Sequence, residues 1–222
     1  MASRGYGQYC GLARALELVG ERWALLIIRD LLVGPRRFTD LRRGLPRIPT
    51  NVLADRLKEL ERDGIVRRRI LPRPASATVY ELTPYGAQVE DAVMRLGMWG
   101  AQSLGEPSPD EIITSDSMTI ALRSTFVPRN AQHTRFTFEL RMGPVVLNAT
   151  VDNGSIHVAE GPAQQADLVI ETGPALKNLF DGSLSASDAL QTGLVRVEGD
   201  ATLLETFAHL FHIETHRETA NI

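Results

Sequence analysis

The stretch from Arg36 to Val66, RRFTDLRRGLPRIPTNVLADRLKELERDGIV, decides the fold of the first half of this chain. Its apolar residues recur at helical spacing on both sides of a short turn that contains proline. The second helix is expected to run from Thr50, whose hydroxyl can cap the first turn, to Asp63, and Gly64 is expected to end it. The stretch therefore predicts two helices with a strand directly behind them.

The second predicted helix has two different faces. At 100° per residue, one side collects Leu53, Leu57 and Leu60, and the opposite side collects Asn51, Asp55, Lys58 and Arg62. Taken alone, this pattern favours an ordinary amphipathic helix with a solvated charged face. Only the neighbouring segments favour a helix whose polar face enters a groove of DNA.

A basic hairpin is predicted directly after this helix. The segments 66–71 and 78–82 alternate like strands, and the proline-bearing segment 72–76 between them cannot be helical. Arginines stand at its base and tip: Arg67, Arg68, Arg69 and Arg73. Because close like charges repel unless an anion is expected, we favour a DNA-contacting wing over a solvated edge hairpin. Helix, turn, helix and wing together predict a winged helix-turn-helix.

The flanking segments complete a helical domain. Cys10 to Val19 is expected to form a first packing helix, and the almost uniformly apolar Trp23 to Val33 a buried one. Phe38 to Leu45 should follow with arginines on its outer surface and flank: Arg37, Arg42 and Arg43. A long helix is expected from Pro84 to about Leu104, with an apolar stripe that packs either against another chain or back on the first helix.

Charge divides the 222 residues into two halves. Through Leu104 there are 17 Lys and Arg against 11 Asp and Glu, and the remainder has 7 against 16. Phosphate is attracted to the first half and repelled by the second, so nucleic-acid binding is expected in the first half only. We predict two domains, 1–105 and 106–222. The single cysteine excludes an intrachain disulfide, and the sequence shows no secretory signal and no run of ~20 apolar residues, so a soluble cytoplasmic protein is expected.

The second half is predicted to be an α+β domain that begins after a linker at Glu106–Pro109. A weak helical pattern covers 112–127. Alternation predicts strands at 133–141, 145–151, 155–159, 167–172 and 194–198, with a hairpin at Asp152-Asn153-Gly154. Helices are expected at 175–180, 185–191 and 202–212.

Four motifs of the first half occur in the order and spacing of a known family: a cysteine near the first helix, ERWALLIIRDLLVGPRRFTDLRR, IPTNVLADRLKELERDGIVRR and YELTPYG. The chain resembles the HxlR family of bacterial winged-helix transcriptional regulators over about its first hundred residues. The resemblance implies a homodimer on a pseudo-palindromic operator in double-stranded DNA. It places nearest the bases Thr50, Asn51, Ala54, Asp55 and Lys58. Nearest the phosphates it places Arg37, Arg42, Arg43, Arg68, Arg69 and Arg73.

The hydrogen-bonding groups of these side chains suggest which bases they contact. The amide of Asn51 suits an adenine edge and Lys58 a guanine, and Asp55 either accepts from a cytosine or repels wrong contacts. Arg56 lies at the edge of the apolar face, so we interpret it as a structural ion-pair residue.

Cys10 falls where some members of this family carry a redox or electrophile sensor. This sequence has Gly11 in place of the usual proline after the cysteine and has no second cysteine to resolve an oxidised one. A helix N-terminus would lower the thiol pKa and make Cys10 a candidate sensor. A free cysteine is more often a small buried side chain, and that interpretation is favoured here.

The segment from Ala166 to Phe211 resembles the sterol carrier protein type 2 fold, whose helices cover one face of a sheet with an apolar tunnel between. The resemblance makes a pocket for a small apolar effector plausible. Its candidate lining is Phe136, Phe138, Leu179, Phe180, Leu190, Leu203 and Phe207. A solid core made of the same residues is the alternative.

Other sites are set aside. His209, His212 and His216 share a helical spacing that could hold a metal, but their place near the chain end favours a solvated or packing role. No set of residues indicates catalysis, a cofactor or a metal site, so we expect a regulator and not an enzyme. The alternative function is a lipid or small-molecule carrier whose N-terminal domain serves for protein association.

Overall fold

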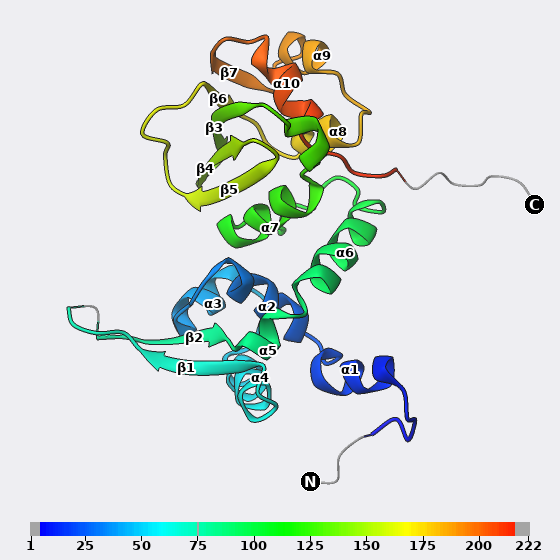
Figure 1. The fold of residues 1–222 in the computed structure, drawn as a ribbon, viewed down its shortest axis with the longest axis vertical. Coiled ribbons are helices and arrows are strands. Elements are labelled where there is room, and N and C mark those ends of the chain that lie inside the picture. The colour runs from blue at the N-terminus through cyan, green and yellow to red at the C-terminus, as the bar shows by residue number, and fades with distance from the viewer. Residues whose placement is uncertain (1–4, 75, 216–222) are drawn as a thin grey trace, which may run out of the picture. The chain divides into compact units, whose positions relative to one another are not determined.

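The computed structural model describes residues 5–74 and 76–215. The chain divides into two compact units, Met1–Val93 and Met94–Ile222 (Figure 1). The first is a helical winged unit and the second an α+β unit, as predicted. The division falls within one helix, upstream of the proposed boundary at residue 105, so that boundary stays a prediction.

The N-terminal unit follows the predicted order of elements. Three helices come first: α1 (Gly11–Val19), α2 (Ala24–Val33) and α3 (Phe38–Gly44). The second predicted helix of the motif and the predicted wing then follow as α4 (Thr50–Arg62), β1 (Val66–Ile70) and β2 (Thr78–Leu82). β1 and β2 pair antiparallel, and the hairpin projects from the helices in Figure 1. An isolated antiparallel bridge pairs Arg36 with Tyr80, so a third short segment lies beside β2.

The core of this unit forms where α2 meets the apolar face of α4. Ile27 and Ile28 are fully buried on α2, and α4 buries the side predicted for it: Leu53, Leu57 and Leu60. The opposite side of α4 therefore faces solvent, which sets the direction of the candidate interface.

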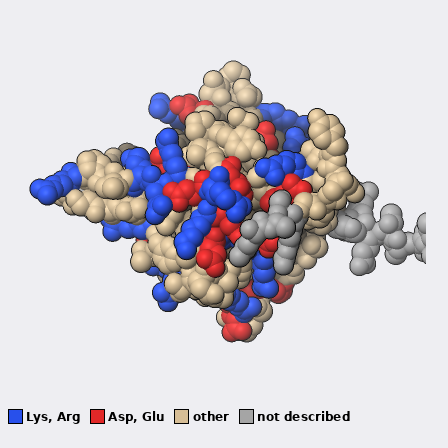
Figure 2. Space-filling model, turned by 90° about the horizontal axis from the view of Figure 1, so that it is seen from below, with Lys and Arg blue, Asp and Glu red and all other residues tan. Residues whose placement is uncertain are grey.

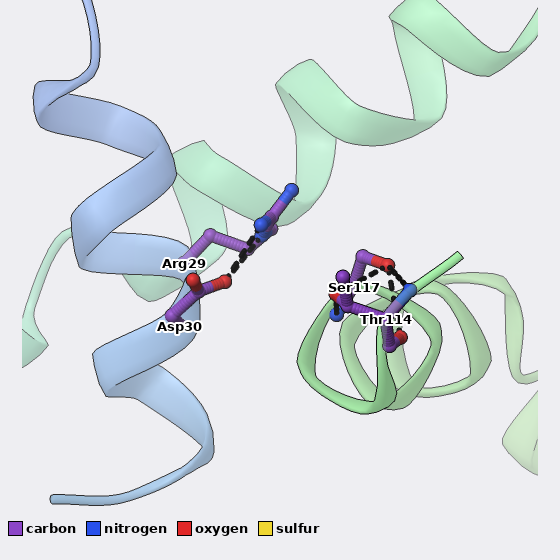
Figure 3. Close-up of polar contacts among 4 residues, drawn as sticks. All are labelled: Arg29, Asp30, Thr114 and Ser117. Carbon is purple, nitrogen blue, oxygen red and sulfur yellow. Dashed lines mark hydrogen bonds and ion pairs between the residues drawn. The ribbon is translucent and has the colours of Figure 1, made fainter. Parts of the chain in front are cut away.

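A buried carboxylate lies on α2. Asp30 has no solvent-exposed surface, and its Oδ1 accepts hydrogen bonds from Arg29 Nε at 2.9 Å and Nη2 at 2.7 Å (Figure 3). Asp30 also approaches α3, because a Cβ on Gly44 would stand 2.9 Å from Asp30 Oδ2. Glycine at position 44 thus allows α3 to pack against a charged group of α2.

The long helix predicted from Pro84 is broken in two: α5 (Pro84–Ala87) and α6 (Glu90–Ala101). Thr83 Oγ1 accepts a hydrogen bond from Gly86 N at 3.0 Å and donates one to Gly64 O at 2.6 Å. A Cβ on Gly86 would stand only 2.1 Å from the carbonyl oxygen of Ile65. This tight contact holds the first turn against the chain that leads into the wing, and two residues separate the end of α5 from the start of α6.

In the C-terminal unit, α6 is followed by α7 (Ser115–Thr125), which is shorter than the predicted 112–127. Its start is fixed by a capping box: Thr114 Oγ1 accepts from Ser117 N at 3.1 Å, and Ser117 Oγ accepts from Thr114 N at 3.1 Å (Figure 3). A short 3₁₀ turn, Pro128–Ala131, leads from α7 into the sheet.

The sheet has five strands in the order β5-β4-β3-β6-β7. The predicted strands are present as β3 (Arg135–Met142), β4 (Val145–Asp152), β5 (Ser155–Glu160), β6 (Leu168–Glu171) and β7 (Arg196–Gly199). All neighbouring pairs are antiparallel except β3 and β6. The remaining helices are α8 (Ala175–Phe180), α9 (Ala186–Gln191) and α10 (Leu203–His209).

Candidate nucleic-acid interface

The outer face of α4 carries the side chains expected to read bases. Thr50, Asn51, Asp55 and Lys58 are exposed and Ala54 is half-buried. Lys58 Nζ lies 3.9 Å from Asp55 Oδ1, and both side chains remain mostly exposed. A loose surface pair of this kind contributes little to stability, so both groups are available to a partner.

Thr50 does not cap the helix as predicted. Pro49 occupies the N-cap position in an extended conformation, and Thr50 is the first helical residue. Proline fixes the entry angle of the chain without any side-chain hydrogen bond to the first turn. The Thr50 hydroxyl is therefore not needed by the helix end, which leaves it available for DNA.

Arg56 differs from its charged neighbours, and its interpretation as a structural residue is confirmed. Only 16% of its side chain is exposed, and it forms ion pairs with Glu59 and with Glu21 at 3.7 Å. Arg56 thus links α4 to the turn before α2. Its ion pairs help to hold α4, and with it the exposed face of that helix, in position.

The arginines expected near phosphates lie at the surface. Arg37, Arg42 and Arg43 are exposed on and beside α3. The backbone N–H of Arg37 donates to Asp40 Oδ2 at 3.0 Å, which closes the first turn of α3. Figure 2, seen from the side on which α4 lies, shows basic side chains along the projecting hairpin and at its tip, with acidic groups interleaved elsewhere on this face.

The argument from repulsion within the wing is wrong, because carboxylates accompany its arginines. Arg67 Nε and Arg69 Nε lie 2.8 and 2.7 Å from the two oxygens of Glu81. Arg68 Nε lies 2.9 Å from Oε1 of Glu61 on α4. Arg73 at the hairpin tip is exposed. The assignment of Arg68, Arg69 and Arg73 to phosphates stays a prediction.

Cys10 is exposed and stands at the N-cap of α1, so the favoured interpretation as a buried side chain is wrong. Backbone amides of Ala13 and then Leu12 lower the pKa of its thiol, as expected for sulfur at a helix N-terminus. The error has a local cause, because α1 buries only Ala13 and leaves most of its surface in solvent.

The seven residues proposed to line an effector pocket lie in one apolar cluster. Five of them are at most 5% exposed: Phe136, Phe138, Leu179, Phe180 and Phe207. Leu190 and Leu203 are partly buried against that cluster. Phe207 stacks edge-on against Phe138, with ring centroids 4.7 Å apart. Two open hollows among the described residues, around His212 and around Trp99, are lined by other side chains.

The proposed absence of a metal site stays a prediction. Within residues 5–74 and 76–215, no group of three His, Cys, Asp or Glu side chains is placed to hold a metal ion. His209 and His212 are exposed, and His216 lies outside the described residues. Over the same residues, no helix is long and apolar enough to span a membrane.

Comparisons with known proteins agree with this geometry. Residues 18–108 match the HxlR-like helix-turn-helix model, and residues 129–212 match the SCP-2 sterol transfer family. The HTH-type transcriptional regulator YodB of Bacillus subtilis is 39% identical over 88 residues, which span 40% of this chain and 79% of that protein. The uncharacterized HTH-type transcriptional regulator YtfH of Escherichia coli is 36% identical over 101 residues, 46% of this chain and 80% of that protein.

Among solved structures, the reduced form of YodB from B. subtilis is 34% identical with a TM-score of 0.39, and spans 46% of this chain and 100% of that chain. The sequence matches, the exposed recognition helix and the basic wing define a DNA-binding transcriptional regulator. The chain belongs to the HxlR-like helix-turn-helix family, and its second domain is of the SCP-2 type.

Proposed function

We propose that the protein is a homodimeric regulator that reads a pseudo-palindromic operator with two copies of α4. The supporting observation is the division of α4 into a buried leucine face and an exposed face that carries Asn51, Asp55 and Lys58. These side chains can hydrogen-bond to base edges in a major groove. Arg37, Arg42, Arg43, Arg68, Arg69 and Arg73 would hold the flanking phosphates.

Self-association is supported by the apolar surface of two helices. Leu12 on α1 is 69% exposed, and Trp99 on α6 is 71% exposed. Exposed apolar faces of this kind are costly in water and are usually covered by a partner. We assign that partner as a second copy of this chain, and a monomer in sedimentation at micromolar concentration would contradict the assignment.

Asn51→Ala and Lys58→Ala should each weaken binding to a DNA fragment from upstream of the protein's own gene by about 10-fold, because a good base contact contributes roughly 1–3 kcal/mol. Binding to random duplex of equal length should fall much less. The measurement is a salt titration of both duplexes by fluorescence anisotropy. A wild type that binds both duplexes weakly and equally would favour the carrier alternative instead.

Cys10→Ser tests whether oxidation of the exposed thiol releases DNA. The lowered pKa raises the fraction of Cys10 present as thiolate, which is the form that attacks peroxide or a quinone. We expect either reagent to dissociate the wild type from its promoter fragment and to leave the serine variant bound. Equal sensitivity of the two proteins would show that Cys10 is not the sensor.

The C-terminal unit is proposed to bind a small apolar effector or to aid assembly, and not to catalyse a reaction. Its match to the SCP-2 family supports the first role. Effector or oxidation would shift the dimer toward a geometry whose recognition helices no longer fit the half-sites. An equal separation of the two helices with and without bound effector would exclude this mechanism for the effector, and failure of a fluorescent fatty acid to bind the intact protein would count against an apolar effector of that kind.

A further inference from the structure

The wing has two chemically different faces. Arg67 lies opposite Glu81, Arg68 opposite Tyr80 and Arg69 opposite Val79 in the β1–β2 register. Because side chains alternate along a strand, Arg67, Arg69 and Glu81 share one face and Arg68 lies on the other. Each face therefore has its own carboxylate, Glu81 on the first and Glu61 of α4 on the second.

The acids lie beneath the arginines. The side chain of Glu81 is 12% exposed, against 59% for Arg67 and 45% for Arg69. Glu61 is 31% exposed and Arg68 58%. A phosphate that approaches the wing thus meets guanidinium groups first, and each carboxylate stays behind the cation it neutralises.

The hydrogen bonds are made by Nε atoms. Arg67 and Arg69 each donate from Nε to Glu81, and Arg68 donates from Nε to Glu61. The terminal amino groups are not used in these contacts. The carboxylates therefore fix the direction of the guanidinium groups, while the two terminal amino groups of each arginine, with four N–H donors, remain for a phosphate.

The two ion pairs of Glu81 persist at neutral pH. The hydrogen bond from Arg69, more than that from Arg67, holds the pKa of Glu81 below its usual value. Two carboxylates thus accompany the four wing arginines, so half of the formal positive charge of the wing has an acidic partner.

We propose that Glu81 and Glu61 are specificity determinants, which lower the affinity for DNA of any sequence by neutralising and orienting the wing arginines. Binding to random DNA depends almost entirely on cationic charge. Binding to an operator also needs phosphate contacts in a fixed register, which oriented arginines provide. The inference rests on the proposed assignment of the wing to phosphates, and it adds Arg67 to that set.

Glu81→Gln tests the proposal with little change in shape. The affinity for random duplex at 50 mM salt should rise about threefold, and the salt slope should steepen by about 0.9, because one more phosphate is neutralised. The affinity for the promoter fragment should rise less, so the ratio of specific to random binding should fall. Anisotropy titrations of the intact protein on both duplexes measure each quantity.

Glu205→Gln is the matched control, because Glu205 is an exposed acid on α10 and its loss changes the net charge equally. We expect no change in either affinity. Glu61→Gln, on the other face of the wing, should repeat the effect of Glu81→Gln and covers the case in which that variant fails to fold.

The outcomes separate this inference from the proposed function. Unchanged or weaker random binding by folded Glu81→Gln and Glu61→Gln would overturn the inference, as would an equal gain in Glu205→Gln. A wild type without preference for its promoter fragment would instead overturn the proposed function.

Discussion

Phe207→Ala should lower the free energy of unfolding of the C-terminal unit by about 3–5 kcal/mol, the usual loss for truncating a buried phenylalanine. Phe207 is fully buried, and its ring centroid lies 4.7, 5.1 and 5.7 Å from those of Phe138, Phe211 and Phe180. Removing the ring leaves a cavity that three neighbouring aromatic rings cannot fill without losing their own contacts. Hydrogen exchange of β3 and β4 amides in the intact protein measures the loss in this unit alone.

Leu194→Ala is the control, since Leu194 is 52% exposed in the same unit and should change stability by less than about 0.5 kcal/mol. A loss below about 1 kcal/mol for Phe207→Ala would mean that the cluster already contains space or relaxes easily. That result would favour an effector pocket lined by the seven apolar side chains proposed above, of which Phe207 is one. The expected large loss would place any effector site outside the immediate surroundings of Phe207.

The sequence contained enough to predict most elements of the N-terminal unit, because helical periodicity and end signals are local. Leu53, Leu57 and Leu60 are buried together as the 100° spacing requires, and Arg56 lies at their edge. Breaks caused by tertiary contact were missed. The helix stops after Ala87, beside the close approach of Gly86 to the backbone of Ile65, and no local pattern reports that distance.

The candidate interface was predictable in outline but not in its electrostatics. Alternation placed the arginines on a strand, yet their partners come from 12 to 14 residues away in Glu81 and from α4 in Glu61. In the same way, the alternation of apolar and polar residues predicted the strands of the C-terminal unit but not their order in the sheet. β3 pairs in parallel with β6, about thirty residues away, and alternation within a strand does not indicate which strand will be its neighbour.

Asp30→Ala should lower the free energy of unfolding of the N-terminal unit by about 3 kcal/mol, because it removes one partner of a buried ion pair. The guanidinium of Arg29 would lose both hydrogen bonds to Asp30 Oδ1 while its side chain stays only 20% exposed. That remaining exposure places the expected loss at the lower end of the range for buried pairs. Hydrogen exchange of α2 amides, together with urea unfolding of the intact protein, measures this loss in the free energy of unfolding.

Asp63→Ala is a control of matched geometry, because Arg62 Nε and Nη2 also bind the carboxylate of the next residue, at 3.0 and 3.1 Å. Arg62 is 71% exposed, so this loss should stay below about 1 kcal/mol. Arg29→Met combined with Asp30→Leu should be less destabilising than Asp30→Ala alone, since the guanidinium of Arg29 is then not left buried without Asp30. Equal losses for Asp30→Ala and Asp63→Ala would mean that burial adds nothing to the pair, and that the packing of α3 against α2 does not depend on this carboxylate.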